Sequence, residues 1–151
     1  MNRSSSPAPE DTTVELSERQ CWELLRRSTI GRLAVGSADG PDIFPVTYLV
    51  DHGTVVFRTA AGTKLAASSH HRVAFEVDGW DDPPSTAWSV VLRGRAERLL
   101  DREENLHALA LPLAPWQEGR KPWFVRVVPD STTGRRLTLT AQARAALHPV
   151  R

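Results

Sequence analysis

The sequence predicts a mainly β protein, an antiparallel barrel with helices at its periphery. Five or six short segments alternate apolar and polar residues with the period of a β-strand. Most of them are joined by short turn sequences, which is typical of hairpins between antiparallel neighbours. The two clear helical patterns occur before the strands and once late in the chain. Helices therefore do not alternate with the strands, which argues against a doubly wound sheet.

The first segment with a helical pattern follows a polar leader. Residues 1–14 are rich in Ser, Pro and Thr, and we expect them to form a disordered tail. Ser17 and Gln20 then match a capping box, in which each side chain bonds to the backbone of the other residue. A helix over about Glu18–Arg27 follows, and we expect Gly31 to break it. Its apolar face contains Cys21, Leu24 and Leu25.

Two glycine-containing turns separate the next strands. Asp39-Gly40 predicts a hairpin turn because glycine tolerates positive φ, and Asp51-His52-Gly53 turns the chain again. Pro45 cannot donate a ladder hydrogen bond, so the strand around it should have an edge or a bulge. The strands predicted here are Arg32–Val35, Ile43–Val50, Thr54–Thr59 and Arg72–Asp78, and Gly62–Ser69 is compatible with a short helix.

The second half of the chain begins with its longest strand-like run, Trp88–Leu99. Gly94 in the middle of that run indicates a bend or a close approach of another backbone. Asp101 and Glu104 resemble a helix cap, and the helix should end near Leu111. The remaining predictions are a sixth strand at Trp123–Val128, an uncertain strand at Leu137–Thr140, and a short helix or tail over residues 141–151. One domain should therefore occupy residues 15–140.

Composition excludes several classes of function. The chain has 151 residues, the length of one domain, with 19 basic and 18 acidic residues and a net charge of +1. This balance argues against nucleic-acid binding. The one cysteine, Cys21, cannot form an intramolecular disulfide and is expected to be a buried apolar residue. We expect a cytoplasmic protein, because no apolar run is long enough to cross a bilayer and residues 1–13 do not resemble a secretory signal.

No metal site is expected from the sequence. The chain has no H-E-x-x-H motif, and one cysteine cannot build a thiolate zinc site. The adjacent His70 and His71 should point apart on either a helix or a strand. Asp81-Asp82 is interpreted as a solvated loop rather than a cation site.

The stretch Val55–Lys64 contains the strongest indication of a ligand. Arg58, Thr59 and Lys64 lie at the end of a predicted strand and the start of a short helix, together with Gly62 and Thr63. Arginine, lysine, hydroxyls and exposed backbone N–H groups are the groups that bind a phosphate monoester. A solvated strand end with ordinary surface charges is the alternative, and the residues alone leave both open.

Tryptophan is abundant for this length. Four of the five tryptophans could stack on a planar ligand, but the core or a subunit contact is the favoured place for each one singly. These four are Trp80, Trp88, Trp116 and Trp123.

The order of these segments resembles the flavin-binding split-barrel family of pyridoxamine 5′-phosphate oxidase-like proteins. It is most similar to small actinobacterial-type members and to relatives of the nitroimidazole-resistance proteins. The resemblance covers about residues 15–137. The matching segments are Ile30–Ala34, Pro45–Tyr48, Val56–Thr59 with Gly62–Leu65, Arg72–Val77, Ser89–Ala96 and Thr133–Arg136.

The resemblance implies a six-stranded antiparallel split β-barrel that forms a homodimer, with two cofactor sites at the subunit interface. It assigns the phosphate to Arg58, Thr59 and Lys64, with Ser89 nearby. The backbone of Val46, Thr47 and Tyr48 would flank the ring system, and Trp123 and Arg136 would approach the ring from the partner subunit.

The implied function is an FMN- or deazaflavin-dependent oxidoreductase that acts on an unknown small molecule. The substrate signature of true pyridoxamine-phosphate oxidases is missing, so oxidation of vitamin B6 is not implied. No side chain is assigned as a general acid or base, and Tyr48 or a histidine is the only suggestion. The alternative is a non-catalytic protein that binds or senses flavin or haem. For haem the available axial ligands are His52, His70, His71 and His107.

Overall fold

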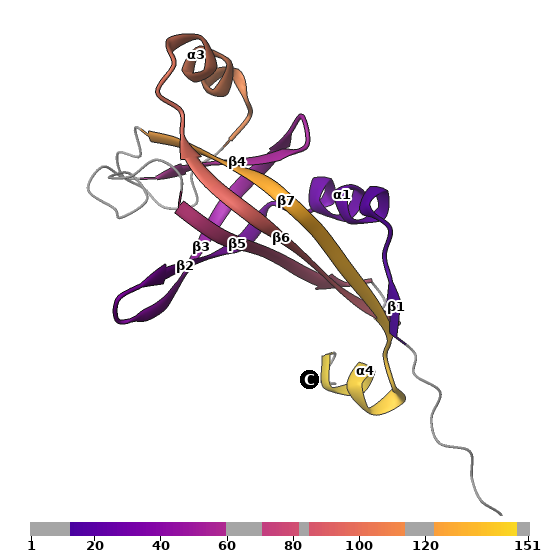
Figure 1. The fold of residues 1–151 in the computed structure, drawn as a ribbon. Coiled ribbons are helices and arrows are strands. Elements are labelled where there is room, and N and C mark those ends of the chain that lie inside the picture. Colours follow the sequence, from indigo (N-terminus) through magenta and orange to yellow (C-terminus); the bar gives the residue numbers. More distant parts are fainter. Residues whose placement is uncertain (1–12, 60–70, 82–84, 114–122, 148–151) are drawn as a thin grey trace, which may run out of the picture.

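The computed structural model describes residues 13–59, 71–81, 85–113 and 123–147, and within them the chain is mainly antiparallel β, as predicted (Figure 1). Seven strands and three helices lie in these ranges. In chain order they are β1 (Thr13–Glu15), α1 (Glu18–Arg27), β2 (Ile30–Ser37), β3 (Gly40–Asp51), β4 (Thr54–Thr59), β5 (His71–Trp80), β6 (Thr86–Arg98), α3 (Arg102–Ala110), β7 (Trp123–Thr138) and α4 (Ala141–Leu147).

Strands β2 to β7 form a closed barrel. The order along the sheet is β1-β7-β4-β3-β2-β5-β6, and an additional pairing of β6 with β7 joins the two sides. Strand β7 therefore pairs with β4 through its first residues and with β6 along most of its length. Figure 1 shows β6 and β7 as the two long neighbouring strands that cross the molecule. The six predicted strands are the six of the barrel, and the short β1 is added to the far end of β7.

Helix α1 closes one side of the barrel. The predicted capping box is present, with the Ser17 hydroxyl accepting from the Gln20 N–H and the Gln20 side chain accepting from the Ser17 N–H at 2.9 Å. Apolar side chains of α1 join the barrel interior in one cluster. That face consists of Cys21, Trp22, Leu24 and Leu25, all of them buried. Cys21 is thus the buried apolar residue that the sequence predicts, and burial raises the pKa of its thiol.

The prediction that Gly31 breaks the first helix is wrong. The helix ends at Arg27, and Ser28 caps it. Gly31 lies inside strand β2, where the ring of Phe75 occupies the space of a Cβ. The glycine is required for this close packing between neighbouring strands and not for helix termination.

The proline and the glycines singled out in the sequence lie where their backbone properties allow. Among the described residues Pro45 pairs with Arg32 of β2 alone, in a part of β3 that lies outside the β3–β4 ladder, so no second described strand needs its missing N–H. His52 and Gly53 form a two-residue turn, both with positive φ (47° and 73°). At Gly94 the β6–β7 register shifts, and a Cβ there would overlap the Val128 carbonyl oxygen.

Three boundaries differ from the sequence prediction. Strand β7 does not end at Val128 but continues to Thr138, so the predicted sixth strand, the residues that follow it and the first two residues of the uncertain segment Leu137–Thr140 are one strand. Thr13 and Val14, assigned to the tail, pair with β7 in β1, and the rest of that tail lies outside the described residues. Ala141–Leu147, left open as helix or tail, is helix α4. The Gly62–Ser69 segment lies outside the described residues.

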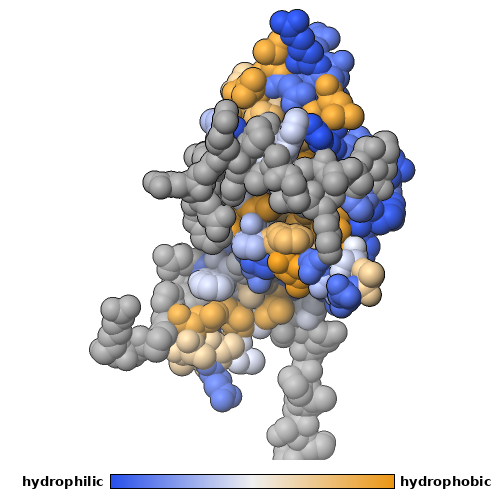
Figure 2. Space-filling view, turned by 90° about the vertical axis from the view of Figure 1, so that its left-hand side faces the viewer, coloured by the Kyte–Doolittle hydropathy of each residue, from blue (hydrophilic) through white to orange (hydrophobic). Residues whose placement is uncertain are grey.

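A second, smaller core lies between the barrel and α3. Val56, Leu99, Phe124 and Ala108 are buried in it. Helix α3 begins where predicted, with the Asp101 carboxylate accepting from the backbone of Glu103 and Glu104. At the top of Figure 2, α3 presents apolar as well as polar side chains outward. No helix in the described ranges is long and apolar enough to span a membrane.

Candidate functional site

Strands β3 and β4 separate at the residues predicted to bind the cofactor. Their ladder ends at the pair Tyr48–Phe57. Beyond it, β3 continues along β2, where Thr47 faces Ile30, whereas β4 continues along β7, where Thr59 faces Trp123. We call this divergence the β3–β4 fork. Its four residues are Val46 and Thr47 on β3 and Arg58 and Thr59 on β4.

The two β4 residues of the fork present their side chains to opposite faces. Successive residues of a strand alternate, and Phe57 belongs to the barrel core. Thr59 therefore faces the same side as Phe57 and is 8% exposed. Arg58 faces the side of the second core, where its guanidinium lies 5.2 Å from the centroid of the Phe124 ring. A single phosphate could therefore contact both Arg58 and Thr59 only if it lay beyond the end of β4, where the two faces of the strand meet.

A second guanidinium lies close to the fork. Arg98, at the end of β6, lies over the ring of Trp123 with its Cζ 3.2 Å from the centroid. Trp123 is the direct partner of Thr59 in the β4–β7 ladder. Two arginines and a tryptophan thus gather at one end of β4 and β7. Arg98 is not among the residues predicted to bind the cofactor, and its only local signal in the sequence is its place on a strand with Arg93 and Arg95. Lys64 lies outside the described residues.

Tyr48 is a core residue and not an available acid or base. Its side chain is 1% exposed, and its hydroxyl donates to the Leu25 carbonyl at 2.7 Å. The Phe75 ring packs edge-on against it, with 5.0 Å between centroids. Burial raises the pKa of Tyr48 far above its ordinary value. The side chain cannot reach a ligand in this position, so only a role for the Tyr48 backbone, next to the fork, stays a prediction.

Ser89 and Arg136 lie in another part of the same sheet. Ser89 faces Arg135 across β6 and β7 and lines a surface cavity of about 590 Å³ with Arg93 and Thr133. Arg136 faces Trp88, and its Nε is buried without a hydrogen-bond partner among the described residues.

Trp123 and Arg136 stand near opposite ends of β7. They are thirteen residues apart, which corresponds to roughly 40 Å of strand. One subunit therefore cannot bring both to one site. Trp123, which the resemblance assigns to the partner subunit, lies beside Thr59 of its own chain.

Two of the predicted stacking tryptophans share a cavity. Trp80 and Trp88 line a hollow of about 530 Å³ between the end of α1 and the β5–β6 hairpin, together with Arg27 and Asp81. Trp80 is 53% exposed, whereas the Trp88 side chain packs against the barrel core. Trp116 lies outside the described residues.

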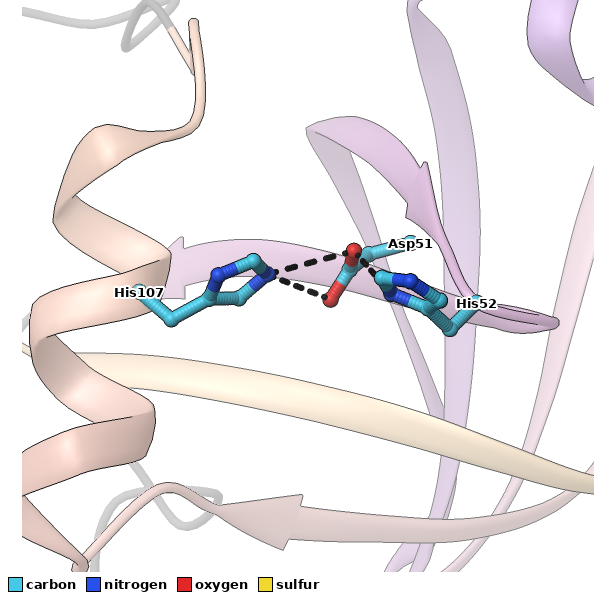
Figure 3. A group of neighbouring side chains, drawn as sticks. All are labelled: Asp51, His52 and His107. Atoms are coloured by element: carbon cyan, nitrogen blue, oxygen red, sulfur yellow. Dashed lines mark hydrogen bonds and ion pairs between the residues drawn. The ribbon is translucent and has the colours of Figure 1, made fainter.

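A polar cluster at the β3–β4 turn was missed by the sequence analysis. Figure 3 shows the rings of His52 and His107 on two sides of the Asp51 carboxylate. His52 Nδ1 lies 2.8 Å from Asp51 Oδ1, and His107 Nε2 lies 3.4 Å from both carboxylate oxygens. Arg126 donates to Oδ2 at 3.1 Å. The cluster had no local signal, because Asp51 and His107 are 56 residues apart.

The contacts within this cluster keep the carboxylate of Asp51 charged. Asp51 is 7% exposed, and burial alone would raise the pKa of its carboxyl. Hydrogen bonds from His107 and His52 outweigh burial and hold the pKa of Asp51 below its ordinary value. The carboxylate is therefore ionised at neutral pH, although it is buried.

The closed six-stranded barrel with its β3–β4 fork is a split β-barrel. The sequence profile of the pyridoxamine 5′-phosphate oxidase family matches residues 17–136. The chain belongs to this family, as the order of its segments indicated.

Relatives of similar length support this assignment. The uncharacterized protein Rv0080 of Mycobacterium tuberculosis is 32% identical over 142 residues, which cover 90% of this chain and 93% of the relative. A Corynebacterium glutamicum crystal structure, provisionally assigned as a pyridoxamine 5′-phosphate oxidase, is 39% identical with a TM-score of 0.78, covering 88% of this chain and 98% of the other. A Mycobacterium smegmatis structure described as an FAD-binding protein is 36% identical with a TM-score of 0.72, covering 83% and 98%.

Proposed function

We propose that this protein is a flavin-dependent oxidoreductase that holds the phosphate of its cofactor at the β3–β4 fork. The observation that carries the proposal is the separation of β3 and β4 at Val46, Thr47, Arg58 and Thr59, next to a second guanidinium from Arg98. The FAD-binding relative from M. smegmatis, 36% identical, supports a cofactor of the flavin class. The flavin would supply the hydride or electron transfer.

The residues of the fork would bind different parts of the cofactor, those on β4 its phosphate and those on β3 its ring system. Arg58 offers forked N–H donors that match phosphate oxygens, and the Thr59 hydroxyl adds a further donor at the strand end. On β3, the backbone of Val46 and Thr47 would bond to the edge of the ring system. Lys64 enters the proposal from the sequence alone, as a point charge for the same phosphate.

The second subunit is part of the proposal. Ser89 and Arg136 lie away from the fork in their own chain, and Arg136 stands near the opposite end of β7 from Trp123. We propose a homodimer in which Arg136 of one subunit approaches the ring bound at the fork of the other. Arg136 suits such a role because its Nε is buried without a hydrogen-bond partner among the described residues.

Flavins with and without phosphate test the assignment of Arg58. FMN carries the phosphate monoester and riboflavin lacks it. We expect Arg58→Ala to weaken FMN binding at least about tenfold and to leave riboflavin binding unchanged, because a charge-assisted contact to phosphate contributes about 1.5–3 kcal/mol. Fluorescence titration measures both affinities. Arg26→Ala, an exposed position on α1, is the matched control.

The same titration can contradict the proposal. Equal losses for FMN and riboflavin would show that Arg58 acts on the fold and not on the phosphate. Absence of micromolar binding of FMN, FAD and deazaflavin alike would remove the function itself. Mass spectrometry of any ligand released from the purified protein then distinguishes the three cofactors.

A non-catalytic flavin-binding protein is the second candidate. The burial of Tyr48 favours it, because this removes the side chain suggested from the sequence as an acid or base. Reduction of the bound flavin by a nicotinamide donor, followed by faster reoxidation with a small-molecule acceptor than without it, would favour the enzyme. A haem titration that produces a Soret band, lost in one His→Ala variant, would favour a haem protein.

A further inference from the structure

We propose that Asp51, His52 and His107 form a site for a divalent transition-metal ion of the zinc class, separate from the flavin site. One carboxylate and two imidazoles converge there from the β3–β4 turn and from α3 (Figure 3). Their donor atoms all lie within 4.8 Å of one another. Imidazole nitrogens with a carboxylate oxygen are donors that Zn²⁺, Co²⁺ and Ni²⁺ accept, whereas Ca²⁺ and Mg²⁺ prefer oxygen alone.

The distances suit a shared ion. Zinc holds nitrogen and oxygen ligands at about 2.0–2.2 Å, so two ligands at a tetrahedral angle lie about 3.3–3.5 Å apart. His107 Nε2 is 3.4 Å from Asp51 Oδ1 and Oδ2, a long hydrogen bond whose length also matches the separation of two ligands on one ion. His52 Nδ1, at 2.8 Å from Oδ1, would move outward by about half an ångström. Its ring is 86% exposed and has the space to rotate.

The surroundings orient the carboxylate as a ligand. Arg126 donates to Oδ2 at 3.1 Å and leaves Oδ1 for the ion. A carboxylate held in this way by an outer hydrogen bond is a recurrent feature of metal sites. The side chain of Arg126 is 20% exposed, and it keeps the carboxylate in place without an ion.

The ion would join two parts of the fold that are remote in sequence. His52 belongs to a two-residue turn with positive φ, and His107 lies in the last turn of α3. The half-exposed His107 ring leaves the fourth position open to solvent, so water would complete the coordination. A bound ion would therefore fasten α3 to the β3–β4 turn.

Direct metal binding tests the site on the full-length protein after dialysis against a chelator. We expect Zn²⁺ to bind with one ion per chain in isothermal titration calorimetry. Co²⁺ should give visible absorption bands typical of a site with nitrogen ligands. Because loss of an outer partner already costs about 10–100-fold in metal affinity, His52→Ala and His107→Ala should each weaken binding at least about tenfold. Both side chains are at least half exposed, so the variants should fold.

His71→Ala is the matched control, because His71 lies at the start of β5 and is not one of the three residues of the cluster. It should bind Zn²⁺ as the wild type does. The proposal is overturned if micromolar wild-type protein binds no Zn²⁺ in the presence of about a hundredfold excess of the ion. It is also overturned if neither His52→Ala nor His107→Ala changes the affinity for Zn²⁺, or if His71→Ala abolishes binding. Flavin titration of the same variants separates the two sites, since the metal site can fail while FMN still binds.

Discussion

The hydroxyl of Tyr48 donates a hydrogen bond of 2.7 Å to the carbonyl oxygen of Leu25, and so joins strand β3 to the last turn of α1. Both residues are almost completely buried. The carbonyl belongs to a helix end, where the last C=O groups have no partner within the helix. The phenol therefore satisfies a helix terminus inside the core, directly before the β3–β4 fork.

Removal of this hydroxyl should lower stability and leave the cofactor site intact. Tyr48→Phe keeps the ring but removes the shorter of the two hydrogen bonds to the buried Leu25 carbonyl, which keeps the Ser28 N–H at 3.4 Å. The expected cost is about 0.5–1.5 kcal/mol in the free energy of unfolding. Urea denaturation measures the loss. FMN affinity should stay within about threefold of wild type. A large loss of affinity with unchanged stability would instead place the Tyr48 side chain at the cofactor.

The ionisation of Tyr48 can be followed without interference, because it is the only tyrosine of the chain. Burial raises the pKa of its phenol in the folded state. The folded protein should therefore show no tyrosinate absorbance at pH 10–11, whereas the chain unfolded in guanidinium should titrate near pH 10. Titration of the folded protein near pH 10 would contradict the burial of this side chain.

The same shift predicts how stability depends on alkaline pH. Below about pH 10 the phenol is neutral in both states and its contribution to stability is complete. Above that pH the unfolded chain ionises first, so stability falls by up to about 1.4 kcal/mol per pH unit until the folded pKa is passed. Tyr48→Phe, measured by urea denaturation at each pH, should lose this component of the slope.

Two glycines of β2 form a matched pair for testing the packing of the barrel. A methyl group at Gly31 would overlap the ring of Phe75, whereas one at Gly36 would meet nothing within 4 Å. Gly31→Ala should cost about 1–3 kcal/mol, the usual cost of overpacking. Gly36→Ala should be neutral or stabilising by about 0.5–1 kcal/mol. Thermal unfolding of both variants checks the contrast, and equal effects would contradict it.

Mixed dimers test whether two subunits build each flavin site. If Arg58 and Arg136 serve one site from different subunits, the Arg58→Ala and Arg136→Ala homodimers each have two damaged sites. A heterodimer of the two variants has one site with both changes and one with neither. Unfolding and refolding the variants together should therefore restore tight FMN binding to about one site per heterodimer. No recovery after verified mixing would place both residues in one subunit's site, or Arg136 in none.

Features coded by neighbouring residues were predictable from the sequence. The Ser17–Gln20 capping box and the His52-Gly53 turn depend on side chains or backbone angles within a few residues, and both are present. The extent of β7 was not predictable. Pro129 and Asp130 indicate a loop, but Pro129 lies opposite Gly94 at the register shift of β6, where a bulge accepts proline.

Long-range contacts explain what the sequence missed in the sites. The Asp51–His107 contact needs α3 to fold back over the β3–β4 turn, and no local pattern encodes that. The opposite faces of Arg58 and Thr59 follow from strand alternation, but their neighbours Phe124 and Trp123 depend on the β4–β7 pairing. The sequence therefore indicated which residues suit a phosphate, while topology decides which of them share a surface.

The position of β7 as the shared neighbour of β4 and β6 has a consequence for synthesis. These two strands have left the ribosome before β7 has, so the nascent chain holds an open sheet with two unpaired edges until the residues of β7 emerge. Such edges are templates for pairing with other chains. Pairing of β7 with both strands therefore removes two aggregation-prone edges in one step.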